Sequence, residues 1–199
     1  MKDEKPVTSI VSTLDGLNED GPVDAARILE EFGQAAVAAV MILPALLVAS
    51  PLSAIPLFSS VCGLCIALVA VQGALGRDHL WLPGFLRRRT LPQEKTRKAT
   101  GPMYRIAGWL DYLTDPRLSL VVRGPMKRML YLVCAAAALC IPVLELVPMA
   151  STTIGFAVVF IGVGLLARDG LFALGGLAVM GAAVFLVTRI LATAQGLLG

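Results

Sequence analysis

The feature that most constrains this chain is a long run without any charged residue, from Gly33 to Gly76. At about 1.5 Å of rise per residue, this run can form two helices of about 20 residues, the length that crosses the hydrocarbon core of a bilayer. The link at 50–56 contains two prolines and no positive charge, which predicts a tight turn. We therefore expect membrane crossings at about 33–50 and 57–76.

Three further apolar runs follow in the C-terminal part of the chain, at 129–147, 153–167 and 171 to about 191. Hydrophobic residues make up 57% of the 199 positions and charged residues only 16%, so much of the apolar surface must face lipid. The sequence predicts an all-α membrane protein, a polytopic helical bundle of about five crossings.

The segment between the two apolar parts is strongly basic. It holds twelve of the seventeen Lys and Arg residues between Arg77 and Arg128. Short loops of this basicity stay in the cytoplasm, and their cations suit anionic lipid headgroups, although topogenesis alone explains part of the charge. Nucleic acid is not expected, because the aromatic residues here form no recognised binding module. The candidate headgroup contacts are Arg87, Arg88, Arg89, Lys95, Arg97 and Lys98.

The N-terminal segment is polar and mildly acidic and lacks the features of a cleavable signal peptide, so we expect it in the cytoplasm. Apolar residues at helical spacing over 7–17 predict an amphipathic helix. This helix lies either on the membrane surface or against the cytoplasmic face of the protein itself. The expected organisation is a cytoplasmic segment at 1–32, a first membrane repeat at 33–84, a basic interfacial segment at 85–123, and a second repeat with a final helix at 124–199.

The two apolar parts resemble each other without gaps at an offset of 91 residues, which indicates two degenerate internal repeats. Pro51 matches Pro142, and the pair Arg77-Asp78 matches Arg168-Asp169. Repeats of this kind are common in transporters, where two halves meet at a site near the middle of the membrane. The repeats are parallel if both Arg-Asp pairs face the cytoplasm, and an inverted arrangement stays open.

Five charged residues are candidates for a functional role at the repeat interface. The Arg-Asp pairs either pair with each other across the two repeats, where they gate or contact an anion, or each caps its own helix. Capping is expected because cations favour helix C-termini and Asp caps the next N-terminus. A carboxylate near lipid is costly unless it faces water or a partner, although the acid in the second Pro-interrupted run also fits an outer surface. The candidates are Arg77, Asp78, Glu145, Arg168 and Asp169.

Several segments resemble the ExoD family of bacterial membrane proteins, which is named for exopolysaccharide synthesis. The resemblance covers about 30 to 195 and implies a protein of the bacterial inner membrane that is linked to exopolysaccharide production. It brings no catalytic residues. Its motifs are Leu43-Pro44-Ala45-Leu46-Leu47, Pro51-Leu52-Ser53-Ala54-Ile55-Pro56, Leu75-Gly76-Arg77-Asp78-His79-Leu80-Trp81-Leu82-Pro83 and Gly164-Leu165-Leu166-Ala167-Arg168-Asp169-Gly170-Leu171.

The function we expect is a non-enzymatic accessory or transport role in exopolysaccharide synthesis or export, alongside the machinery of that pathway. The alternative is a small transporter or channel for an anion or a lipid-linked precursor, with the repeat interface as its pathway. No nucleotide-binding or glycosyltransferase pattern is visible, and a single histidine forms no metal cluster, so we expect no enzyme, cofactor or metal. Five helices scarcely enclose a pathway, and C-terminal glycines permit close helix contacts, so we expect a homodimer.

Overall fold

The structure is a computed structural model. It describes residues 8, 12, 23–55, 57–76, 90–91, 108, 112, 121–122, 124–144 and 150–198. Both Thr8 and Ser12 are helical, but the rest of the predicted amphipathic helix at 7–17 lies outside the described residues. Most of the basic segment at 85–123 lies outside them as well.

The first apolar part forms a helical hairpin. Helix α2 (Ala25–Ala49) has a kink at Gly33, whose φ of 47° and ψ of −120° are not helical. The apolar part of the helix, which follows Gly33, therefore runs in a different direction from the first turns. The helix ends where Ser50 donates from Oγ to the Leu47 carbonyl at 2.7 Å. The proline-rich turn contains a short 3-10 helix, η1 (Pro51–Ala54), and α3 (Phe58–Ala74) returns along α2.

The C-terminal part supplies three helices, α6 (Gly124–Leu144), α7 (Ala150–Ala167) and α8 (Gly170–Leu198). A short antiparallel pairing of β1 (Val23–Asp24) with β2 (Thr90–Leu91) also connects two distant segments. For the residues that the structure describes, the prediction of an all-helical protein is confirmed apart from this two-residue pairing.

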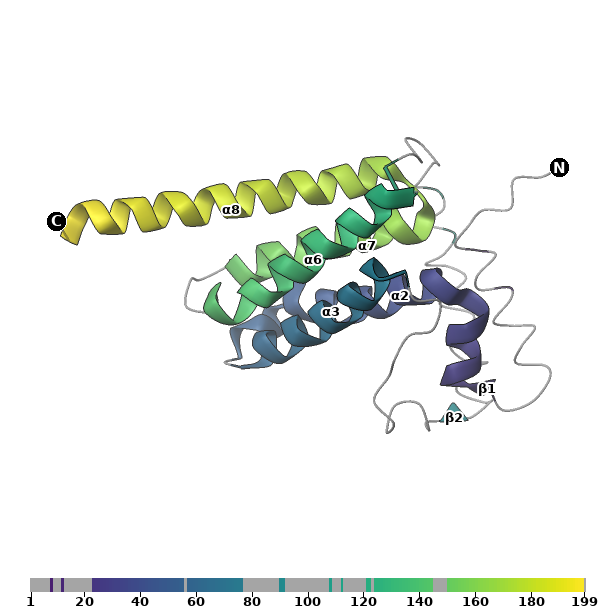
Figure 1. The fold of residues 1–199 in the computed structure, drawn as a ribbon. Coiled ribbons are helices and arrows are strands. Elements are labelled where there is room, and N and C mark those ends of the chain that lie inside the picture. Colours follow the sequence, from purple (N-terminus) through teal and green to yellow (C-terminus); the bar gives the residue numbers. More distant parts are fainter. Residues whose placement is uncertain are drawn as a thin grey trace.

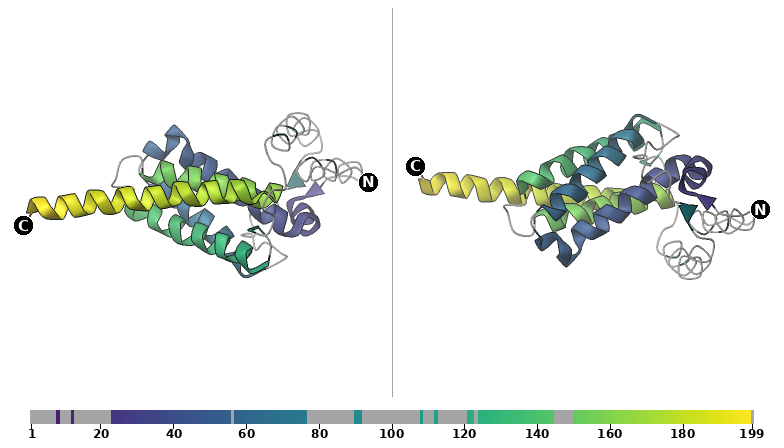
Figure 2. Two further views of the ribbon diagram at one scale, coloured as in Figure 1. Left: turned by 90° about the horizontal axis from the view of Figure 1, so that it is seen from above. Right: turned by 90° about the horizontal axis from the view of Figure 1, so that it is seen from below.

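The helices α2 and α3 form one hairpin and α6 and α7 another, and each helix of one hairpin packs against a helix of the other. Helix α2 lies along α7, and α3 lies along α6, while α8 packs on α7 and continues beyond the other helices (Figures 1 and 2). The end of α3, the start of α6 and the corner between α7 and α8 all lie at one end of the bundle. We call it the basic end because Lys127, Arg128 and Arg168 are there.

Glycines bring the backbones of neighbouring helices close together. A Cβ at Gly155 of α7 would lie 2.7 Å from the backbone nitrogen of Ala49 in α2. A Cβ at Gly63 of α3 would lie 2.9 Å from the Ala138 carbonyl oxygen in α6. Both distances are too short for any side chain, so these two helix crossings require glycine.

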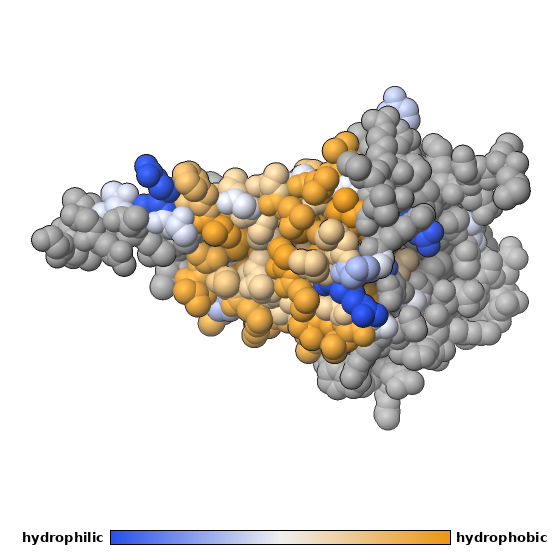
Figure 3. Space-filling view, turned by 45° about the horizontal axis from the view of Figure 1, so that its top comes forward, coloured by the Kyte–Doolittle hydropathy of each residue, from blue (hydrophilic) through white to orange (hydrophobic). Residues whose placement is uncertain are grey.

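The exterior of the bundle is apolar. Large hydrophobic side chains are exposed on each of the long helices, such as Leu43 of α2, Val61 of α3, Leu132 of α6, Phe156 of α7 and Phe185 of α8. Figure 3 shows a broad hydrophobic face with hydrophilic residues at both of its ends. Among the described residues, α6 and α7 are long and apolar enough to cross a membrane, and shorter apolar helices lie at Ala35–Ala49, Phe58–Ala74 and Gly170–Phe185.

The predicted apolar runs all correspond to helices, but some bounds differ. Helix α8 continues to Leu198, beyond the predicted end near 191, and both ends of α6 differ. The sequence predicts the third crossing at 129–147, whereas α6 begins at Gly124 and ends at Leu144. Our prediction started where the charges stop, while the helix includes Lys127 and Arg128 in its first turns. Gly124 and Pro125 explain the earlier start, because proline is well suited to the first turn of a helix.

Two adjacent glycines on α8 provide a test of this packing. A Cβ at Gly176 would lie 2.7 Å from the Ala157 carbonyl oxygen, whereas a Cβ at Gly175 would meet nothing within 4 Å. We predict that Gly176→Ala lowers the stability of the purified protein by about 1–3 kcal/mol because α8 is forced away from α7. Gly175→Ala, the matched control, should be neutral or raise stability by up to about 1 kcal/mol, because alanine favours the helix. Thermal unfolding in detergent measures both, and equal losses would contradict the packing.

Candidate functional site

The corner between α7 and α8 is built from the Arg168-Asp169 pair. The Asp169 backbone N–H donates to the Gly164 carbonyl at 2.9 Å, which closes the last turn of α7 in the manner of a Schellman motif. The Asp169 side chain, only 2% exposed, accepts a hydrogen bond at Oδ1 from the Leu171 backbone N–H at 2.8 Å. Asp169 is therefore the N-cap of α8, one of the two roles that the sequence suggested for it.

Arg168 occupies the position of this corner that normally favours glycine. Its φ is 57°, in the left-handed region, and its side chain is exposed. A non-glycine residue in this conformation costs roughly 1–2 kcal/mol. Local backbone geometry alone would thus favour glycine over arginine at this position.

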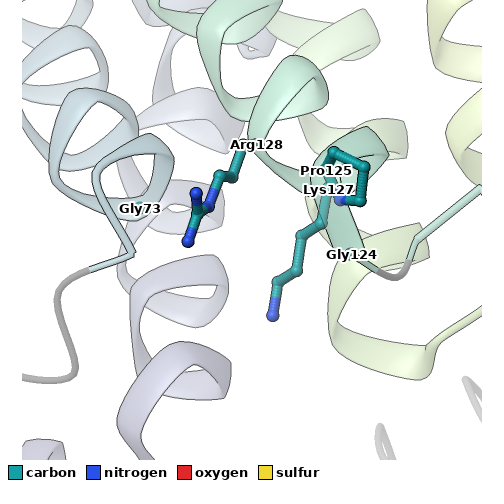
Figure 4. A pocket seen from close by; sticks show the side chains of 5 residues that line it. All are labelled: Gly73, Gly124, Pro125, Lys127 and Arg128. Carbon is teal, nitrogen blue, oxygen red and sulfur yellow. The ribbon is translucent and has the colours of Figure 1, made fainter.

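A cavity of about 400 Å³ lies at the basic end, between α3 and the start of α6. Its described lining consists of Gly73, Gly124, Pro125, Lys127 and Arg128. Figure 4 shows the long side chains of Lys127 and Arg128 extending from α6 into the space beside the end of α3. The cavity is therefore lined by two cations and by residues that carry little or no side chain.

The end of α3 allows α6 to approach because its last residues are small. A Cβ at Gly73 would lie 2.8 Å from the ring of Tyr131, which is fully buried. A Cβ at Gly76 would lie 3.3 Å from Nη2 of Arg128, so the guanidinium group lies against the end of α3. This position suits a cation, because the C-terminal end of a helix carries partial negative charge.

Among the described residues, the charged side chains at the cavity are all positive. Lys127 is half-buried and lies close enough to Arg168 for their charges to repel. The N-terminal end of α6 adds partial positive charge and backbone N–H groups without intrahelical partners. Within the described part of the chain no ion pair neutralises Lys127, Arg128 or Arg168, and the carboxylate of Asp169 is already engaged with α8. The arrangement attracts anions.

A second, apolar cavity of about 550 Å³ lies between α6, α7 and α8. It is lined near the far ends of these helices by residues such as Val133, Cys140, Ile154, Met180 and Val184. It offers surface to hydrocarbon and almost no polar group. No chemistry can be assigned to it beyond contact with an apolar chain.

The family model for exopolysaccharide synthesis, ExoD, matches residues 7–189. The chain belongs to the ExoD family. The ExoD protein of Rhizobium meliloti is 29% identical over 124 residues, which is 61% of this chain and 51% of that protein, about half its length. An uncharacterized protein of Synechocystis is 29% identical over 161 residues, 79% of this chain and 74% of that protein. No solved structure matches the chain.

The family assignment confirms the resemblance seen in the sequence, and the structure locates some of the candidate residues. Arg168 and Asp169 are at the basic end. Arg77, Asp78 and Glu145 lie outside the described residues, as do the headgroup candidates Arg87, Arg88, Arg89, Lys95, Arg97 and Lys98. Among the residues that the structure does describe, no group of three His, Cys, Asp or Glu is placed to hold a metal ion.

Sequence reasoning missed Lys127 and Arg128 as lining residues. Both follow Gly124-Pro125 and precede a long apolar run, so they appeared to be simple flanking charges. One signal was available, because cations in the first turn of a helix oppose its dipole and are unfavourable there unless something else stabilises them.

Two substitutions distinguish the capping role of the Asp169 side chain from the role of its negative charge. Asn is as good an N-cap as Asp, so Asp169→Asn should change the unfolding free energy by less than about 1 kcal/mol. Asp169→Ala removes the acceptor for the Leu171 N–H and should cost about 0.5–2 kcal/mol. Unfolding of the two variants in detergent measures the difference. A loss of activity in Asp169→Asn without loss of stability would show that the charge acts at the repeat interface.

Proposed function

We propose that this chain is an integral protein of the bacterial inner membrane with an accessory or transport role in exopolysaccharide synthesis or export. Membership of the ExoD family supports the pathway. The observation that carries the membrane location is the apolar exterior, since exposed leucine, valine and phenylalanine side chains surround the described helices. In water such a surface would drive aggregation, whereas lipid accommodates it.

We propose five crossings, formed by α2, α3, α6, α7 and α8, with the N-terminus in the cytoplasm. The ends of α3 and α7 lie together at the basic end, which supports two hairpins of parallel orientation. The high content of Lys and Arg in the connection between α3 and α6 supports a cytoplasmic location for that end.

We further propose that the hairpins α2–α3 and α6–α7 are degenerate copies of one unit. In the repeat, α2 corresponds to α6 and α3 corresponds to α7. The contact of α2 with α7 therefore corresponds to the contact of α6 with α3, and both contacts are present. Gly63 and Gly155, at nearly corresponding places in the repeat, make the same kind of close backbone approach. This reciprocity supports an approximate two-fold relationship.

The packing between the hairpins favours the accessory role over transport by a single chain. The interface is filled by fully buried apolar residues such as Met41, Ile66, Ile141 and Ile161. Among the described residues the buried polar side chains are Ser59, Gln72, Ser151 and Asp169. A polar solute would find few partners there, and burying a polar group without partners costs several kcal/mol. The alternative of an anion or precursor transporter therefore requires a second copy or a different arrangement of the helices.

A homodimer is the oligomer we propose. Gly155, Gly162, Gly164 and Gly176 are used inside the chain, because a Cβ at each would meet another helix or the α7–α8 corner. Gly181 meets nothing within 4 Å, and it is exposed on α8 together with the small residues Ala178 and Ala182. Small residues on a lipid-exposed helix allow a second helix to approach closely, which supports α8 as the contact between copies.

The orientation leads to a labelling prediction. In a variant without native cysteines, a cysteine placed at Arg89 should not react with a membrane-impermeant maleimide in intact cells, but it should react after the cells are opened. A control cysteine at Glu145, which this topology places at the outer side, should react in intact cells. Labelling at position 89 from outside would contradict the orientation.

The role in the pathway leads to a second prediction. Disruption of the gene should lower exopolysaccharide output, and a copy supplied in trans should restore it. Purified protein in liposomes separates the two roles: a flux of an anion or a lipid-linked precursor that disappears in Asp78→Asn and Glu145→Gln would support transport. A folded wild-type protein that moves neither solute, in a strain whose output depends on it, would support the accessory role.

A further inference from the structure

We propose that the cavity at the basic end binds the phosphate group of an anionic ligand, with Lys127 and Arg128 as direct contacts and Arg168 as a third, nearby cation. The proposal adds a binding site to the function described above, and the choice of a lipid as the source of the phosphate rests on the proposed membrane location. Three observations carry it. Cations from two distant segments gather at one end of the bundle, and the cavity that Lys127 and Arg128 line there has room for a phosphate group. Arg168 occupies an unfavourable backbone position, although no ion pair within the described residues uses its charge.

The first observation concerns the origin of the cations. Lys127 and Arg128 come from the start of α6 and Arg168 from the end of α7, so segments far apart in sequence bring like charges together. Their repulsion opposes the packing of α6 and α7 at this end. An anion with several oxygen acceptors would turn this repulsion into attraction, because it binds more than one cation at once.

The second observation concerns the volume of the cavity and its position relative to the membrane surface. Its volume of about 400 Å³ is ample for a phosphate group and its ester substituent, and the small residues Gly73 and Gly124 leave the space open to the side chains of Lys127 and Arg128. The start of α6 contributes backbone N–H groups of the kind that bind phosphate at helix N-termini. The apolar part of α6 begins at Met129, directly after these cations. In a membrane-spanning α6 the cations therefore lie at the depth of lipid phosphates.

The third observation concerns Arg168. Its left-handed backbone disfavours a residue with a side chain, and Asp169 and the backbone already make the hydrogen bonds of the corner. The Arg168 side chain is exposed, and in the described part of the chain it makes no ion pair. The charge of Arg168 is thus not needed for the turn, and it lies at the same end of the bundle as the start of α6, which carries Lys127 and Arg128.

The test uses the purified full chain in detergent with two probes, dioleoyl phosphatidate and inorganic phosphate, and dioleoyl phosphatidylcholine as the neutral lipid. Native mass spectrometry measures retained lipid, and isothermal titration measures inorganic phosphate. We expect phosphatidate to bind in preference to phosphatidylcholine. Arg128→Gln and Lys127→Gln should each weaken phosphatidate about tenfold or more, the effect of losing one hydrogen bond to a charged group.

Arg168→Gly keeps the proposal testable even if variants in α6 fold poorly. Glycine relieves the left-handed backbone, so this variant should unfold at the same temperature as the wild type or higher, yet bind phosphatidate several-fold more weakly. The matched control is Arg189→Gln, which removes an exposed arginine from the C-terminal part of α8, away from the basic end. It should leave binding unchanged.

The outcomes separate the sources of the phosphate and separate this site from the proposed function. Binding of phosphatidate alone assigns the site to a lipid, and binding of inorganic phosphate with the same dependence on Arg128 and Arg168 assigns it to a soluble phosphate. Equal binding by the wild type, Arg128→Gln and Arg168→Gly, or an equal loss in Arg189→Gln, overturns the site. Binding that depends on these residues in a protein whose loss leaves exopolysaccharide output normal supports the site and overturns the proposed function.

Discussion

The close approach of helix backbones at glycines is the interaction on which the rest of the structure depends. In a lipid environment, apolar side chains gain little by moving from the exterior to the interior, so helix association relies on packing at short range. Gly155 against Ala49 and Gly63 against Ala138 supply this packing between the two hairpins. Gly176 against Ala157 attaches α8 to α7 in the same way. The bundle is thus held by contacts that a single added methyl group would disturb.

The same close packing creates the site at the basic end. Gly73 makes room for the ring of Tyr131, and Gly76 makes room for the guanidinium group of Arg128, so the first turns of α6 lie directly against the end of α3. The cations at the start of α6 are thereby held near the corner that carries Arg168. Small residues along α3 therefore have two effects. They allow α6 to pack closely in the apolar core, and they bring the cations of α6 against the end of α3.

Sequence reasoning found the parts of this structure that depend on local pattern. The uncharged run and its prolines predicted the first hairpin, and the acidic residue after the end of α7 suggested the cap that Asp169 forms. The apolar run did not reveal that the helix itself begins at Gly124, because hydropathy does not distinguish a charged first turn of a helix from a loop. The cavity was missed because it depends on a contact between Gly73 and α6, which are far apart in sequence, and glycine in an apolar run gives no sign of which helix it will meet.

In the proposed membrane topology, the length of the apolar part of α8 matches the thickness of the bilayer. Its cap, Asp169, is anchored at the basic end, and at about 1.5 Å per residue Arg189 lies about 30 Å further along the helix, close to the thickness of a hydrocarbon core. Neither end can enter the core without carrying a charge into it. In that topology a thinner bilayer would tilt α8, and because α8 packs closely on α7, the rest of the bundle would tilt with it.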